Sequence, residues 1–127
     1  TEIYTLSLHD ALPIFKQADD IIRAGLTKYP DSETLYSPYA LTLAVSGQAL
    51  EAIEWMRKAV SAEPGDPIHY YNLAGMYALT HDKDLAFRNL NIAIDRGYRN
   101  LAKILKDPVF SELINEPEFD KIKIRLQ

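Results

Sequence analysis

The sequence predicts an all-α protein built from a repeated pair of antiparallel helices. Three observations support this prediction. Two segments, beginning at Glu33 and Pro67, match each other position by position, 34 residues apart. Small and large apolar residues recur in both at helical spacing. Residues that favour helix starts and ends fall between the periodic stretches. A fixed period of this length is typical of a helical repeat array.

The matched positions pair large residues with large ones and small residues with small ones. The pairs are Tyr36 with Tyr70, Tyr39 with Leu73, Ala40 with Ala74, Leu43 with Tyr77, Ala52 with Ala86, Met56 with Leu90, Ala59 with Ala93 and Val60 with Ile94. We expect the alanines to let helices approach closely, while the larger side chains fill the space between helices.

This pattern resembles the tetratricopeptide repeat (TPR), in which an aromatic residue, Leu-Gly and Tyr are followed by Ala, Phe, Ala and Pro. Pro64 supplies the final proline of the first full repeat, and Ala18, Ile22, Gly25 and Pro30 mark a preceding half repeat. The resemblance covers about residues 16–98 and implies an antiparallel helix-turn-helix TPR solenoid. Its parts are the second helix of a truncated repeat (15–32), two full repeats (33–66 and 67–98) and C-terminal capping helices (99–127).

Cap and turn residues predict the helix limits. Asp66 is an expected N-cap, followed by proline at the first helical position. Gly47 predicts a turn between helices, and Gly97 the end of the last regular helix. Pro38 falls inside the first helix of the first full repeat, so we expect either a kink there or a start with Ser37 as the cap.

Two similar motifs after Gly97 predict a cap for the array. Asp107-Pro108-Val109-Phe110 and Glu116-Pro117-Glu118-Phe119 each place an acidic residue before a helix and proline at its first position. We expect two short helices that cover the exposed face of the last repeat. This ending resembles that of many bacterial TPR arrays, which often follow a signalling or regulatory domain.

Residues 1–14 resemble the translation of a common short-read sequencing adapter. Their codons can be chosen to match the adapter base for base, and one further T would begin the codon of Phe15. A signal peptide is the alternative, but no Lys or Arg precedes Lys16. We therefore expect this segment to be non-native and the natural N-terminus to lie further upstream.

The composition argues against several classes of function. The chain has no cysteine, which excludes thiolate catalysis, disulfides and cysteine zinc sites and fits a cytoplasmic protein. Its formal net charge of −4 argues against nucleic acid or an anionic membrane as the main partner. No apolar run reaches the length of a membrane helix.

The search for chemistry predicts no enzyme, cofactor, metal site or small-molecule substrate. Neither His69 nor His81 has a carboxylate or second histidine at metal-ligand spacing on a shared helix face. Asp19-Asp20, and Asp82 with Asp84, are interpreted as capping or solvated acids. The sequence contains no glycine-rich phosphate loop and no nucleophile elbow.

The resemblance implies a concave face, lined by the first helix of each repeat, that binds a protein or peptide. The lining residues are Ser37, Leu41, Val45, Ile68, Tyr71, Asn72, Gly75 and Leu79. Tyr71 and Asn72 are the expected polar groups of this surface. The positions that carry a basic carboxylate clamp in chaperone-binding TPR domains are not basic here.

Three functions remain open at this point. The favoured one is an interaction scaffold, the C-terminal arm of a larger bacterial regulatory protein. The second is a substrate-positioning appendage of an enzyme whose catalytic domain lies upstream. The third is a scaffold made only of repeats.

Overall fold

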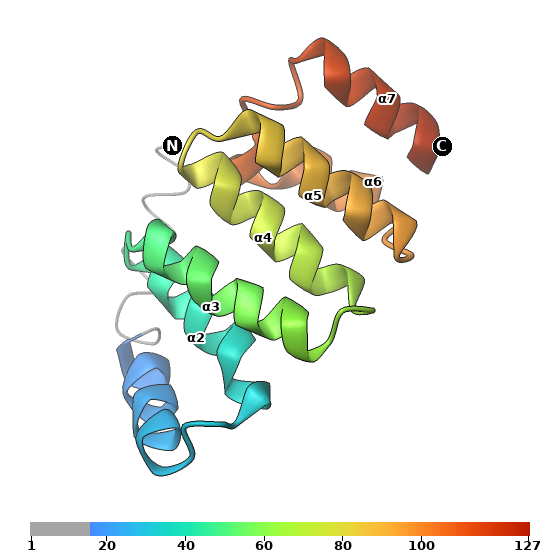
Figure 1. Cartoon of the computed structure of the whole chain (residues 1–127). Helices are drawn as coiled ribbons and strands as arrows, with labels where there is room; N and C mark the ends of the chain where they lie inside the picture. Colours follow the sequence, from blue (N-terminus) through green and yellow to red (C-terminus); the bar gives the residue numbers. More distant parts are fainter. Residues whose placement is uncertain (1–15) are drawn as a thin grey trace. The chain divides into compact units, whose positions relative to one another are not determined.

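The computed structural model describes residues 16–127, which form helices and turns without a β-strand (Figure 1). The adapter-like segment 1–14 lies outside the described residues. The chain divides after Ala62 into two compact units, here called unit 1 and unit 2. The all-α prediction is confirmed, and the TPR arrangement stays a prediction. None of the helices in the described part is long and apolar enough to cross a membrane.

Unit 1 is a helical hairpin with a further helix over residues 16–28. Its other elements are η1 (Glu33–Leu35), α2 (Tyr36–Val45) and α3 (Ala49–Ala62). Helices α2 and α3 pack against each other, and Gly47, with φ of 83°, makes the turn between them as predicted. Ala40 and Ala52 are fully buried in unit 1, as expected where helices approach closely. Trp55 contacts the Tyr39 ring edge-on, with 4.9 Å between centroids.

Pro38 lies inside α2, and Ser37 is not the cap of this helix. Helix α2 starts at Tyr36, and Leu35 occupies the cap position without a side-chain hydrogen bond. Pro38 is thus the third helical residue, within the first turn, where an N–H has no acceptor inside the helix. Residues 33–35 form a 3₁₀ turn immediately before it.

The helix over residues 16–28, predicted as the remaining half repeat, belongs to unit 1. Asp19 forms an ion pair with Arg23 at 2.7 Å and accepts a hydrogen bond from Thr42 Oγ1 at 3.2 Å. A Cβ added at Gly25 would lie 2.9 Å from Leu35 Cδ1. Glycine therefore permits the close approach of this helix to the start of the hairpin.

Unit 2 contains a second hairpin and the C-terminal segment. Its elements are α4 (Pro67–Leu79), α5 (Lys83–Asp95), α6 (Leu101–Lys106), η2 (Pro108–Phe110) and α7 (Pro117–Leu126). Helices α4 and α5 form the hairpin. Asp66 accepts a hydrogen bond from Ile68 N, and Asp82 accepts one from Leu85 N, so both act as N-caps. Helix α5 ends before Gly97, whose φ is 113°, as predicted.

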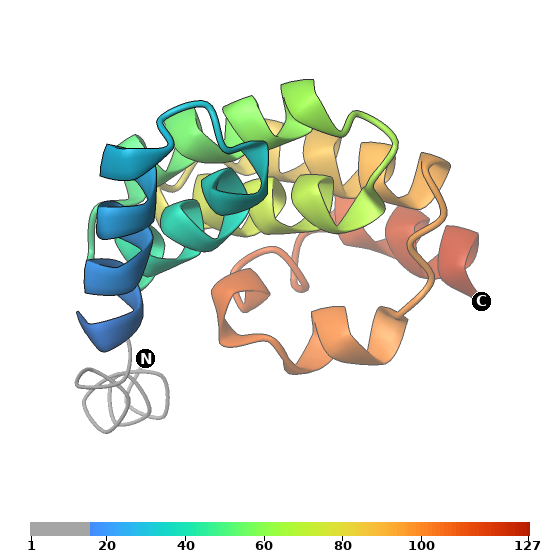
Figure 2. The same ribbon diagram turned by 90° about the horizontal axis from the view of Figure 1, so that it is seen from below.

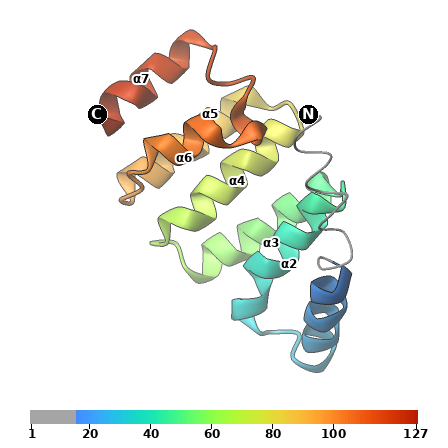
Figure 3. The same cartoon turned by 180° about the vertical axis from the view of Figure 1, so that it is seen from behind.

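The C-terminal segment covers two different helices of unit 2 (Figures 2 and 3). Helix α7 packs on α5 through the fully buried Phe119 and Ile122, which agrees with the predicted cap. The first Asp-Pro motif behaves differently from our expectation. It forms only the 3₁₀ turn η2, which contacts α4 and buries Phe110 completely.

Candidate protein-interaction surface

The predicted surface residues of α2 remain accessible. Ser37, Leu41 and Val45 are spaced four residues apart, so they share one face of the helix. Leu41 is 41% exposed, and Ser37 and Val45 are half-buried. These three residues form a small accessible surface with a leucine at its centre. A partner that covers the leucine would bury apolar area.

The equivalent positions of α4 have a different environment. They are Tyr71, Gly75 and Leu79, each 34 residues after its counterpart in α2. Leu79 is 37% exposed, but Tyr71 is only 4% exposed and Gly75 is buried. Of the other two residues predicted on α4, Ile68 is 45% exposed and Asn72 half-buried.

Residues of the C-terminal segment cover Tyr71. Its ring stacks on Tyr98, with 4.8 Å between centroids, and meets Phe110 edge-on at 5.4 Å. Its hydroxyl donates a hydrogen bond to Asp107 Oδ2 at 2.7 Å. Burial, and then this hydrogen bond, raise the pKa of Tyr71 well above its usual value. The predicted role of Tyr71 as an accessible polar group must therefore be corrected.

Gly75 lies directly beneath the same segment. A Cβ added at Gly75 would be 3.5 Å from Val109 Cγ1 and 3.8 Å from the Phe110 ring. The absence of a side chain thus leaves space that η2 fills. Only Ile68, Asn72 and Leu79 of the predicted α4 surface remain outside this cover.

Unit 2 also carries a basic surface that the sequence reasoning missed. A pocket of about 560 Å³ lies between the start of α4 and the segment after α5. Its lining includes Pro67, Ile68, Tyr98, Arg99, Asn100 and Lys103. A second pocket, of about 460 Å³, shares Asn100 and Lys103 with the first and adds Lys106 and Asp107. We call the surface formed by these two pockets the basic pocket pair.

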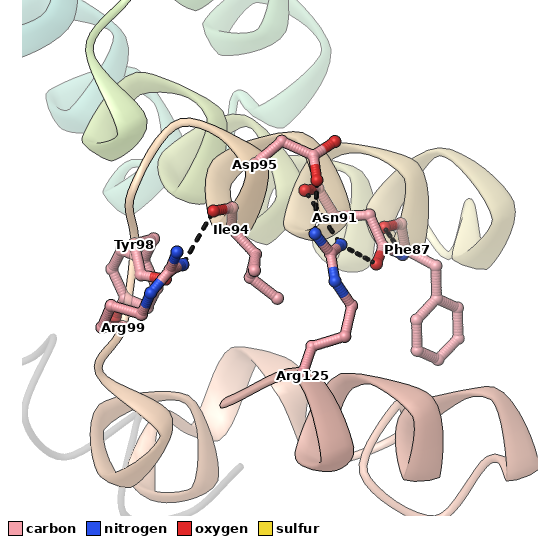
Figure 4. A network of polar contacts seen from close by, with 7 residues as sticks. All are labelled: Phe87, Asn91, Ile94, Asp95, Tyr98, Arg99 and Arg125. Carbon is pink, nitrogen blue, oxygen red and sulfur yellow. Dashed lines mark hydrogen bonds and ion pairs between the residues drawn. The ribbon is translucent and has the colours of Figure 1, made fainter. Parts of the chain in front are cut away.

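Arg99 and Lys103 are held in place by contacts within unit 2. Arg99 Nη1 donates hydrogen bonds to the carbonyl oxygens of Ile94 and Tyr98, both at 2.8 Å, at the C-terminal end of α5 (Figure 4). Lys103 Nζ lies 5.2 Å from the centroid of the Tyr71 ring. A signal for this surface was present in the sequence, because Arg99, Lys103 and Lys106 recur at helical spacing in an acidic chain. We had considered only the first helix of each repeat.

The α7 cap is fixed by a different arginine. Arg125 donates to Asn91 Oδ1 at 2.7 Å and forms an ion pair with Asp95 on α5 (Figure 4). This contact and the buried Phe119 join the last helix to the hairpin. Arg125 is therefore engaged within unit 2 and is not part of the basic pocket pair.

His69 has acidic neighbours that the search along helix faces overlooked. Its Nε2 lies 3.1 Å from Glu63 Oε1 and 3.5 Å from Asp66 Oδ2. Both carboxylates come from the turn before α4, so they lie outside the shared helix face to which the sequence prediction referred. We assign no metal here, since the amide end of α4 disfavours a cation and Asp66 Oδ1 already caps the helix. The cluster joins the turn to the first residues of α4.

In comparisons with known proteins, no protein-family model matches the chain, and no curated protein matches it significantly.

Proposed function

We propose that the chain is an interaction module of the TPR type that binds a protein or peptide segment, as the C-terminal arm of a larger regulatory protein. The observation that carries this proposal is the repeated burial pattern of the two hairpins. At the fully buried packing positions, residues 34 positions apart have nearly the same exposure, although each hairpin belongs to a different unit. The exposed fractions are 0% for Ala40 and Ala74, 0% for Ala52 and Ala86, 0% for Met56 and Leu90, and 2% and 0% for Ala59 and Ala93.

A pattern of this kind supports a repeat in which the matched residues serve packing. The residues at the repeated positions are apolar and buried, so they supply core and no reactive group. In repeat proteins, specificity comes from the positions between the packing residues. Leu41 of α2 is such a position, and it is exposed.

The test is to select binding peptides from a random library with the full chain and to measure their affinities by calorimetry. Leu41→Asp should weaken a selected peptide by about tenfold or more, because it places a charge where an apolar side chain is buried on binding. Leu50→Asp is the matched control. Leu50 lies on α3 of the same hairpin, is 74% exposed, and undergoes the same change of side chain.

Equal affinities for Leu41→Asp, Leu50→Asp and the unaltered chain would reject the α2 face as the binding surface. A library that yields no binding peptide would reject the interaction function itself. Circular dichroism of each variant checks that helix content is unchanged.

A further inference from the structure

We infer that the basic pocket pair of unit 2 binds an acidic peptide segment that also carries an apolar side chain. This inference rests on the proposed function, because it names the class of partner. The basic pocket pair belongs to unit 2, whereas the α2 face belongs to unit 1. An experiment can therefore reject one of the two proposals and keep the other. The occupant is identified by charge and by the apolar lining of the first pocket.

The first argument is the excess of positive charge in the basic pocket pair. Arg99, Lys103 and Lys106 are all exposed. Asp107 is the acidic residue in the lining, and its two oxygens already accept hydrogen bonds from Tyr71 and from Val109 N. The surface therefore presents three cations against one carboxylate, in a chain whose formal net charge is −4. Carboxylates of a partner would complement this local excess.

The second argument is the apolar side of the same pocket. Pro67 and Ile68 form the wall contributed by α4, and Ile68 is 45% exposed. An apolar side chain of the partner would remove Ile68 from water, at roughly 25 cal/mol per Å² of apolar area buried. An acidic residue next to an apolar one in a peptide would thus reach both sides of the pocket.

A peptide fits this surface better than a nucleic acid. The aromatic residue in the lining, Tyr98, is only 5% exposed and stacks on Tyr71, so it presents no free face for a base. A phosphate backbone would gain from three cations but would be repelled by the acidic remainder of the chain. A short acidic peptide contacts only the basic pocket pair and does not extend over the acidic remainder of the chain.

The experiment measures fluorescence anisotropy of a labelled peptide of alternating glutamate and leucine, titrated with the full chain. The matched probe replaces each glutamate with lysine. We expect saturable binding of the glutamate peptide alone, weakened several-fold when NaCl is raised from about 0.05 to about 0.5 M. Amide chemical-shift changes should centre on residues 97–107.

The decisive variant is Lys103→Gln with Lys106→Gln, which removes two exposed charges and leaves the Arg99 cap of α5 intact. We expect the affinity of the glutamate peptide to fall by about tenfold. Lys121→Gln with Lys123→Gln on α7 is the control, because it removes the same net charge away from the basic pocket pair. Helix content by circular dichroism verifies folding, and Lys106→Gln alone serves as a second variant if the double variant unfolds.

Four outcomes would overturn the inference. Equal binding of the lysine peptide would show that charge is not recognised. Equal weakening by the α7 control would show only a net-charge effect. A single-stranded RNA oligonucleotide that binds more tightly and displaces the peptide would assign the surface to nucleic acid. Loss of peptide affinity in the α2 variant Leu41→Asp, with no effect of the lysine substitutions, would keep the proposed function and reject this surface.

Discussion

The two hairpins share a buried pattern but differ on the face that we expected to bind a partner. In the α2–α3 hairpin, Leu41 projects from the middle of that face and is 41% exposed. In the α4–α5 hairpin the equivalent residue is Gly75, and Val109 lies 3.5 Å from where its Cβ would be. The α2 face remains accessible, whereas the chain's own C-terminal segment covers the α4 face at Tyr71 and Gly75. Equivalent positions are therefore exposed in one hairpin and used for packing in the other.

The residue one helical turn earlier differs in the same way. Ser37 on α2 is half-buried, whereas Tyr71 on α4 is joined to the C-terminal segment by a ring stack, an edge contact and a hydrogen bond. A large side chain that projects toward η2 thus stands beside a glycine that leaves room for η2. Tyr71 and Gly75 together explain why residues 107–110 pack on α4.

The largest expected effect comes from removing the residue that covers α4. Phe110 is fully buried and contacts the Tyr71 ring edge-on. Phe110→Ala should lower the free energy of unfolding by about 3–5 kcal/mol, because it removes buried apolar area and leaves a cavity. Urea unfolding followed by circular dichroism measures the change. Leu41→Ala, on the accessible face, should cost less than about 1 kcal/mol; similar losses for both would refute the contrast between the hairpins.

A smaller effect is expected when α4 is given the residue of α2. Gly75→Leu places a side chain where Val109 and Phe110 lie, which should destabilise the fold by about 1–3 kcal/mol through overpacking. Amide hydrogen exchange should become faster over residues 107–113, since the segment is displaced from α4. Gly75→Ala is the control, because its Cβ would meet Val109 at an ordinary contact distance of 3.5 Å. Unchanged exchange in Gly75→Leu would show that the glycine is not needed for the cover.

The smallest effect is expected from removing one hydroxyl. Tyr71→Phe removes the hydrogen bond to Asp107 and keeps the ring contacts, so it should cost about 1 kcal/mol near neutral pH. The raised pKa of Tyr71 means that the folded state favours the protonated hydroxyl. This contribution is fully present below the unfolded pKa of 10.0 and is lost as the pH rises above it.

The contribution of Tyr71 to the pH dependence of stability can be isolated by comparing the unaltered chain with the Tyr71→Phe variant. The free energy of unfolding of the unaltered chain should fall more steeply above pH 10.0 than that of Tyr71→Phe. Chemical denaturation at a series of alkaline pH values measures both slopes, and the difference removes the titration of lysines and of tyrosines other than Tyr98, whose pKa depends on Tyr71. Equal slopes for the two proteins would show that Tyr71 is not the group whose ionisation lowers the free energy of unfolding at alkaline pH.

Much of the secondary structure could be predicted because its signals are local. Asp66 before Pro67, Gly47 and Gly97 act at the positions we assigned to them, since caps and left-handed turns depend on neighbouring residues alone. Pro38 was misread, because the sequence does not say whether a proline falls in the first turn or after it. Ser37, Leu41 and Val45 are accessible on α2, and their role in binding stays a prediction. The His69 cluster lies in a turn before α4, and the basic residues of the basic pocket pair follow the last periodic helix, so the 34-residue period predicts neither.

The sequence by itself determined that the described chain is helical, where its hairpins turn, and which residues form the core of each hairpin. These follow from periodicity and from caps, which act within a few residues along the chain. Only the tertiary structure decided that residues 107–110 cover α4 while α7 covers α5. The two Asp/Glu-Pro motifs are alike locally, and the first packs on α4 because of Gly75 and Tyr71, more than thirty residues away. The shape of the surface that receives a segment is a property of packing, and no local pattern encodes it.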